Sequence, residues 1–203
     1  MTEEGWRPEN HAPEGWPVAL RGVTEAVVTT LGPNGLWNVA ALGLHAGDPV
    51  TARTYGNTRT RRNFERQGGG VVQFVADPRD FVDAALSIRE EPDSVLGSAD
   101  AWVEVAAQQV DSREENGTTI RTWELSPVEN EVVRARPTTY NRAFGAVVEA
   151  TVAASRLGIE GFDDVQLRSR LDRFAETVER CGGEREREAM ARVAEQADWS
   201  PDD

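Results

Sequence analysis

The chain of 203 residues carries 35 acidic residues against 22 basic ones, all of them arginine, and its formal net charge is -13. A surface this acidic repels nucleic acid and anionic lipid over most of its area, so we expect neither as a partner. The single cysteine excludes an internal disulfide framework. No apolar run approaches the roughly 20 residues of a membrane span, so we expect a cytoplasmic protein.

The excess of carboxylates also bears on the source of the protein. Hydrated carboxylates keep a protein soluble at high salt, where screening tolerates their mutual repulsion. A halophilic source is therefore a hypothesis. Unfolding at low salt would support it, and full stability in dilute buffer would argue against it.

Residues 1–18 are expected to form an extended N-terminal arm, because they contain three prolines and show little periodicity. Trp6 and Trp16 in this arm are expected to pack on the body of the protein, since large aromatic side chains are rarely left wholly in water. The globular part of the chain is therefore expected to begin at residue 19.

The first three predicted strands follow one another closely. Residues 23–31 and 36–44 have strand composition, and Gly32-Pro33-Asn34-Gly35 between them is typical of a hairpin turn. Residues 50–55 are predicted as the third strand. The small side chains within 40–43 let a flat ligand approach the backbone or, alternatively, make room for a neighbouring helix.

Two short helices are predicted between the next strands. Residues 58–67 are expected to form a helix that ends at the glycines 68–70. A buried strand is predicted at 71–75. Asp77-Pro78 then begins a second helix over 79–86, because proline is favourable in the first helical turn.

The remaining strands are predicted to form a hairpin. Residues 90–100 are expected to be a loop, and 102–110 pairs with 118–125 across Glu114-Glu115-Asn116-Gly117. A last strand is predicted at 131–135. Six or seven strands joined mostly by hairpins favour a small closed antiparallel barrel over a parallel sheet. The absence of a Gly-x-Gly-x-x-Gly or P-loop motif argues against a Rossmann or P-loop nucleotide site.

From Pro137 the pattern becomes helical, so we divide the chain into a barrel at 19–136 and a C-terminal helical region at 137–203. A helix capped by Thr138 or Thr139 is predicted to run to Leu157. Its charged residues form one stripe of seven-residue spacing: Arg142, Glu149 and Arg156. A helix with so narrow a polar stripe is buried against the barrel or a partner subunit. Two further helices are predicted at 162–181 and 184–197.

Residues 50–64 form the one concentrated basic segment of the chain. A strand that breaks at Gly56-Asn57 and continues as a helix N-terminus presents free N–H groups and a partial positive charge, which suit an anion. Arginines and hydroxyl residues converge there: Arg53, Arg59, Arg61 and Arg62 with Thr54, Tyr55, Thr58 and Thr60. An organic phosphate is the expected ligand. The alternative is a surface turn whose arginines pair with carboxylates.

Several segments together resemble the flavin-reductase-like FMN-binding split barrels. Residues 25–43 resemble the opening hairpin of that superfamily, 53–64 its phosphate segment, and 71–85 the strand and helix that follow. The helix at 140–152 is similar to that of a largely uncharacterised, mainly archaeal family within the superfamily, which carries a helical C-terminal region. The resemblance implies an α+β fold, a mainly antiparallel split β-barrel with short inserted helices.

The resemblance also implies a homodimer with FMN at or near the subunit interface. It implies that Asn38, Val39 and Ala40 lie along the flavin ring through backbone groups. Arg53, Thr54 and Tyr55 would line the third strand beside the flavin. The resemblance assigns the phosphate to Thr58, Arg59 and Thr60, with Asn63 nearby. Gln73 is a weaker candidate for an amide near the ring. Asn141 and Arg142 are candidates for contacts from the partner subunit.

The resemblance implies an FMN-dependent oxidoreductase that takes electrons from NAD(P)H. A non-catalytic FMN-binding carrier, sensor or electron-transfer protein is the alternative, and an assembly domain without flavin is a third possibility. The sequence offers no paired carboxylates, no catalytic triad and no nucleophilic cysteine that would indicate another reaction. Glu25 and Glu149 are conceivable acid–base groups, but solvated or ion-paired glutamates are the common case in so acidic a chain.

Overall fold

The computed structural model describes residues 12–115, 117–137 and 139–200. The strands are β1 (Val23–Leu31), β2 (Trp37–His45), β3 (Val50–Tyr55), β4 (Gly69–Val75), β5 (Arg89–Glu91), β6 (Ala99–Glu115) and β7 (Thr118–Val132). The helices are α1 (Arg59–Gln67), α2 (Pro78–Leu86), α3 (Arg142–Ala154), α4 (Asp164–Cys181) and α5 (Glu184–Ala197). None of these helices is both long and apolar enough to span a membrane.

The strands form one antiparallel sheet in the order β1-β4-β6-β7-β3-β2-β5. Because β1 also pairs with β2, six of the strands close into a barrel, and β5 is added at the outside of β2. The fold is thus α+β, with a mainly antiparallel barrel, short inserted helices and C-terminal helices. This confirms the predicted fold class.

The β1–β2 hairpin positions one wall of the site described below. Gly35 adopts a left-handed φ of 80°, and the Gly32 N–H donates to the Leu36 carbonyl at 2.7 Å. From this turn the pairing runs from Leu31 opposite Trp37 to Val23 opposite His45. The predicted hairpin is confirmed, with β2 shifted by one residue.

The glycines at 68–70 do more than end the helix as predicted. Gly68 is the left-handed C-cap of α1, but Gly69 and Gly70 are the first residues of β4. A Cβ atom on Gly70 would lie 2.6 Å from the Thr29 carbonyl oxygen. The close approach of β1 therefore requires glycine there, a contact between distant residues that local turn propensity does not reveal.

The second half of the sheet differs from the prediction in three places. The predicted loop at 90–100 contains β5 and the start of β6, because residues 89–91 pair with β2. The β6–β7 hairpin is longer than predicted, with Glu115 paired opposite Thr118. The strand predicted separately at 131–135 is the end of β7. Pairing across the barrel extends strands into polar segments that lack strand composition.

The barrel interior is filled by branched and aromatic side chains. Phe64 of α1 and Trp123 of β7 are almost fully buried and meet edge to face, with ring centroids 5.3 Å apart. Trp16 at the end of the N-terminal arm is also buried in this cluster, as predicted. Trp6 lies outside the described residues.

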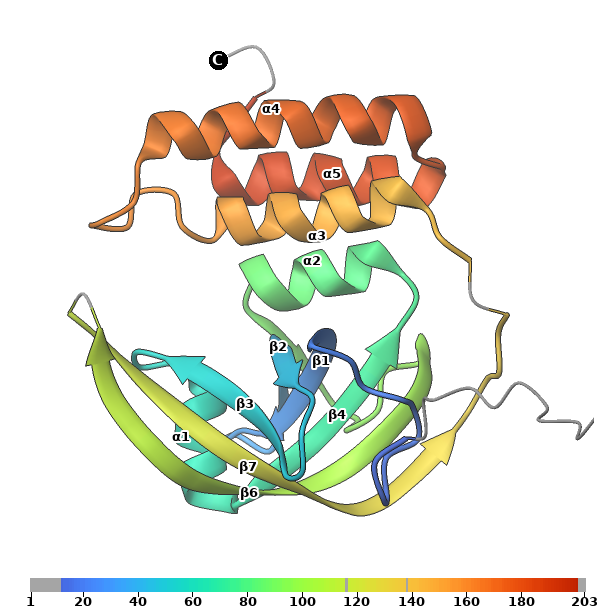
Figure 1. The fold of residues 1–203 in the computed structure, drawn as a ribbon, viewed down its shortest axis with the longest axis vertical. Coiled ribbons are helices and arrows are strands. Elements are labelled where there is room, and N and C mark those ends of the chain that lie inside the picture. The colour runs from blue at the N-terminus through green and yellow to red at the C-terminus, as the bar shows by residue number, and fades with distance from the viewer. Residues whose placement is uncertain (1–11, 116, 138, 201–203) are drawn as a thin grey trace, which may run out of the picture.

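Helices α2 to α5 form a layer over one end of the barrel (Figure 1). Its core contains many alanines together with Val147, Leu171 and Val193. Val82 and Leu86 of α2 pack into the same core. Since α2 lies between two barrel strands in the chain, it fixes the helical layer to the barrel.

The start of α3 corrects the predicted helix cap. Asn141 is the N-cap, and its Oδ1 accepts a hydrogen bond from the Ala143 N–H at 2.9 Å. The helix was predicted to begin at Thr138 or Thr139. Thr138 lies outside the described residues, and Thr139 precedes the helix. Asparagine and threonine are both favourable caps, so the type of residue alone could not choose between them.

Candidate functional site

A pocket of about 830 Å³, here called the main pocket, lies between the barrel and the helical layer. This volume is within the usual range for small-molecule and cofactor sites. Strands β1, β2 and β3 and the start of α1 provide the barrel wall. Helix α2 and the end of α3 provide the helical wall.

Nine of the thirteen residues proposed from the sequence line the main pocket. They are Asn38, Val39, Ala40, Arg53, Thr54, Tyr55, Thr58, Arg59 and Thr60. These residues come from β2, β3 and the first turn of α1, so the barrel closure brings together segments that are separated in the chain. The structure thus places the predicted ring segment and the predicted phosphate segment on one wall.

The junction of β3 and α1 forms the polar end of this wall. Gly56 turns the chain with a left-handed φ of 62°, and Thr58 caps α1 by accepting a hydrogen bond from the Arg61 N–H at 3.2 Å. The first turn of α1 contains no acidic residue. The free N–H groups and the helix dipole at this end therefore favour an anion.

Arg53 contributes a cation whose charge is not paired within the described chain. Its Nε atom is buried and has no hydrogen-bond partner, and no described carboxylate forms an ion pair with it. A buried donor without a partner is costly, so a ligand that accepts from Arg53 gains that hydrogen bond. The neighbouring Thr54 hydroxyl is held by the Trp123 indole N–H, which donates to it at 2.9 Å.

Two titratable groups that line the main pocket have shifted pKa values, His45 and Glu25. Burial and the positive charge of Arg53 lower the pKa of His45, so its neutral form is favoured. Burial and the nearby charge of Glu149 raise the pKa of Glu25. Glu25 is the single carboxylate among the described residues that line this pocket. Glu149 instead forms an ion pair with Arg170 at 3.1 Å. Ion pairing was the alternative to an acid–base role for both glutamates.

Gln73 corrects the sequence-based assignment of an amide near the ring. Its side chain is fully buried and does not line the main pocket. Nε2 donates to Thr29 Oγ1 at 3.1 Å and to the Ser94 carbonyl at 2.9 Å, and Oε1 accepts from the Leu96 N–H at 2.7 Å. These bonds to the core explain why the amide is not directed into the pocket.

The other three predicted residues also lie away from the main pocket. Asn63 lies on the buried face of α1 and donates to Thr30 Oγ1 of β1 at 2.9 Å. Asn141 is the α3 cap, and the Arg142 guanidinium lies 3.0 Å from Cys181 Sγ. None of the three lines the main pocket within the chain. The contribution of Asn141 and Arg142 from a partner subunit stays a prediction.

The helical wall was missed by sequence reasoning. Its residues are Phe81, Ala84, Ala85, Ser87, Ile88, Thr151, Val152, Ser155 and Ile159. The narrow polar stripe of the α3 segment did indicate burial against another surface. The particular contact could not be found, because α2 and α3 lie far apart in the sequence and meet only when the helices pack.

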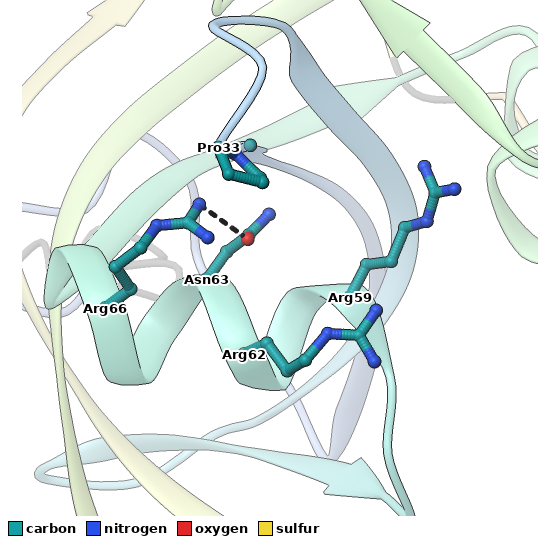
Figure 2. A pocket seen from close by; sticks show the side chains of 6 residues that line it. Pro33, Arg59, Arg62, Asn63 and Arg66 are labelled. Carbon is teal, nitrogen blue, oxygen red and sulfur yellow. Dashed lines mark hydrogen bonds between the residues drawn. The ribbon is translucent and has the colours of Figure 1, made fainter.

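A second pocket, of about 230 Å³, lies between α1 and the turn that joins β1 and β2 (Figure 2). Its lining residues are Gly32, Pro33, Arg59, Arg62, Asn63 and Arg66. Arg59 lines both pockets, so the two are adjacent. No group of three or more potential metal ligands occurs among the residues that the structure describes.

Solved structures with a similar fold include a crystal structure described as the FMN-bound protein MM1853 from Methanosarcina mazei. It is 24% identical, the match covers 87% of this chain and 96% of that chain, and the TM-score is 0.73. Two more distant matches are the flavin reductase HpaC complexed with NADP⁺ (15% identical, 57% and 82% covered, TM-score 0.39) and the styrene monooxygenase flavin reductase of Pseudomonas putida S12 (14% identical, 56% and 82% covered, TM-score 0.41).

Two family models match the chain. Residues 24–134 match the model described as "Protein of unknown function (DUF447) N-terminal domain". Residues 141–195 match the model described as "Protein of unknown function (DUF447)". The two matches correspond to the barrel and to the helical layer, in agreement with the predicted resemblance to a family with a helical C-terminal region. The chain belongs to the DUF447 family.

Proposed function

We propose that the chain binds FMN in the main pocket and acts as a flavin-dependent oxidoreductase. The observation that supports this most directly is the polar end of the pocket. There the N-terminus of α1 and its hydroxyl residues line the same pocket as Arg53, whose buried Nε has no hydrogen-bond partner among the described residues. The similar fold of a family member whose crystal structure is described as FMN-bound also supports the choice of ligand.

The residues present fit the chemical groups of FMN. Thr58, Arg59 and Thr60 would hold the phosphate through the α1 N-terminus, hydroxyls and a guanidinium, which are donors that a phosphate prefers. Asn38, Val39 and Ala40 on β2 would lie along the ring. The small side chains Ala40 and Gly43 leave the strand backbone accessible to a flat ligand.

Bound FMN would supply the electron-transfer chemistry, and the chain supplies position and electrostatics. Arg53 and Arg59 place positive charge on the barrel wall. Phe81, Val152 and Ile159 on the helical wall limit access of water to the opposite side. Glu25 and His45 are the carboxylate and imidazole groups on this pocket that can exchange a proton, and the raised pKa of Glu25 lies closer to neutral pH than that of an ordinary glutamate.

A non-catalytic FMN carrier, sensor or electron-transfer protein is the second candidate. The described residues on the pocket walls are compatible with binding alone as well as with catalysis. The two functions therefore have to be distinguished by assay. NADH and NADPH oxidation is measured with added FMN and an electron acceptor. Turnover supports the enzyme, and tight FMN binding without reduction by either nicotinamide supports the carrier.

The experiment that tests FMN binding is an absorbance and fluorescence titration of the protein with FMN, at low and high salt. A perturbed flavin spectrum with saturable binding is expected. The double variant Arg59→Ala/Thr60→Ala is expected to lose about 1.5–3 kcal/mol of binding free energy, because it removes charge-assisted hydrogen bonds. Arg173→Ala, an exposed arginine on α4, is the control for lost charge. Unchanged affinity in the double variant would show that the phosphate lies elsewhere.

We also infer that the protein is a homodimer. Three valines are exposed near the end of β7 and just beyond it: Val128, Val132 and Val133. Exposed apolar side chains along one element favour association with another protein surface. Sedimentation equilibrium tests this inference, and Val128→Glu is expected to shift a dimer towards monomer. A monomeric wild-type protein at micromolar concentration would contradict it.

A further inference from the structure

The second pocket lies along one face of α1, beside the turn that joins β1 and β2 (Figure 2). Arg59, Arg62 and Arg66 are three and four positions apart, so they project from the same side of the helix. Pro33 in the turn faces them across the pocket. The pocket is thus bounded by three guanidinium groups on one side and by a rigid turn residue on the other.

The base of the second pocket is held by hydrogen bonds. Asn63 is 4% exposed, and its amide donates to Thr30 Oγ1 on β1. Asn63 Oδ1 in turn accepts from the Arg66 guanidinium at 2.9 Å, and Arg66 also donates to the Leu31 carbonyl. Arg66 is therefore oriented by the barrel before any ligand binds, which reduces the entropy that binding would cost.

The charge of the second pocket is unusual in so acidic a chain. Arg62 and Arg66 donate only to neutral oxygens and form no ion pair with a described carboxylate, although the chain carries 35 acidic residues. Arg59 alone among the three has such a partner, Glu90 at 2.8 Å. By contrast, Arg61 on the neighbouring face pairs with Glu65 at 2.6 Å. The described lining of the second pocket therefore presents cations and no carboxylate.

The position of the second pocket indicates which anion it suits. Arg59 lines both this pocket and the main pocket, where the phosphate of FMN is expected at the start of α1. Arg62 and Arg66 lie about one and two turns further along the helix. A ligand that extends past the first phosphate therefore reaches these arginines next. Guanidinium groups bind phosphate in bidentate geometry, and no described carboxylate of the chain pairs with Arg62 or Arg66, so both are available to a phosphate.

We propose that the second pocket binds a second phosphate group, one that belongs to an adenine dinucleotide whose other half occupies the main pocket. The proposal rests on the proposed nucleotide function of the main pocket. FAD and NAD(P)H share this chemistry, since each carries an adenylate phosphate in addition to the phosphate nearest its redox ring. The second pocket then distinguishes dinucleotides from FMN and influences which electron carrier the protein accepts.

The first experiment measures binding of inorganic pyrophosphate to flavin-free protein by calorimetry at low salt. Arg62→Gln and Arg66→Gln are each expected to weaken binding about five- to tenfold, because each removes a charged donor. Arg173→Gln on α4 is the control with the same charge change. Equal weakening in all three variants, or in none, would overturn the proposal. Thermal unfolding checks each fold, and Arg62→Gln leaves the contacts of Arg66 to β1 intact.

The second experiment compares the affinities of FMN, FAD, NADH and NADPH for the same variants. If the variants bind FAD more weakly and FMN with unchanged affinity, the occupant is FAD. If they bind NADH or NADPH more weakly and FMN with unchanged affinity, the occupant is the nicotinamide dinucleotide. An equal loss for FMN and the dinucleotides would overturn the proposal, because the pocket would then hold the phosphate of FMN itself. A wild-type protein that binds pyrophosphate through Arg62 and Arg66 but never FMN would instead refute the proposed function.

Discussion

The two walls of the main pocket come from different regions of the molecule and differ in chemistry. The barrel wall presents two guanidinium groups, those of Arg53 and Arg59, and several hydroxyls. The helical wall presents mainly apolar side chains, and its two α3 hydroxyls, of Thr151 and Ser155, donate to carbonyls of their own helix. The barrel is therefore suited to recognise a charged ligand, and the helical layer is suited to cover it.

The two regions also differ in how their interiors are packed. The barrel core uses aromatic and branched residues such as Phe64 and Trp123, whereas the helical core contains many alanines, which let helices approach closely. Helix α2 belongs to the barrel segment of the chain but packs into the helical core. The geometry of the pocket therefore depends on the docking of α2, and the following predictions test that dependence.

The largest expected effect tests whether barrel and helical layer unfold together. Leu125→Ala in the barrel and Leu171→Ala in the helical layer remove side chains that are 1% and 0% exposed. Each is expected to lower the free energy of unfolding by about 2–5 kcal/mol. Because α2 joins the two cores, we expect one cooperative transition in both variants, measured by denaturant unfolding with circular dichroism and tryptophan fluorescence. The exposed Val165→Ala is the control, with an effect within about 0.5 kcal/mol.

Separate transitions for the two optical signals would show that α2 does not couple the regions. In that case Leu171→Ala would melt the helical layer and leave the barrel folded, and the helical wall would be lost first.

The next effect concerns the hydrogen bond that fixes the barrel wall. Thr54→Val leaves the buried Trp123 indole N–H without its acceptor and is expected to cost about 1–3 kcal/mol of stability. Thr54→Ser keeps the hydroxyl and is the matched control. Urea unfolding measures both. Thr54→Val removes only the hydroxyl and keeps the γ-methyl group, so a loss in Thr54→Val no larger than that in Thr54→Ser would contradict the assignment to the hydrogen bond.

A smaller effect tests the neutrality of the helical wall. Val152→Glu adds a negative charge opposite the cationic barrel wall and is expected to weaken FMN binding by roughly 1 kcal/mol at low salt. Val152→Gln has a similar size without the charge and is expected to bind FMN more tightly than Val152→Glu. Fluorescence titration at two salt concentrations measures the difference, which should shrink as salt screens the charge. A difference that is independent of salt would contradict the electrostatic explanation.

The smallest effect concerns Glu25 on the barrel wall, which faces Glu149 on α3. Burial and Glu149 raise the pKa of Glu25 in the folded protein, so the ionised carboxylate lowers stability. This cost is fully present above the raised pKa and is relieved as the pH falls through it. Glu25→Gln is therefore expected to be more stable than wild type at neutral pH, with a difference that disappears in acid. Thermal unfolding across this pH range measures it, and a difference that grows in acid would contradict the assignment.

Local signals in the sequence predicted much of the barrel and of its polar wall. Asn-Gly and Gly-Pro turns, Val- and Thr-rich runs and the Thr58 cap depend on residues close together in the chain, and the structure contains the corresponding elements. Most of the ligand residues that the resemblance implied line one pocket, because barrel closure brings their segments together. The local signals did not predict β5 or the full length of β6 and β7, because those segments become strands only by pairing with distant partners.

The sequence by itself thus determined the hairpin order, the helical C-terminal region and the cationic segment at the start of α1. Only the tertiary structure decided which side chains meet around the pocket. In the folded protein the Gln73 side chain points into the core, where three hydrogen bonds hold it. Phe81 and Val152 lie together on the helical wall of the pocket. The physical reason is that turn chemistry and periodicity act over a few residues, whereas barrel closure and helix docking depend on packing between residues far apart in the chain.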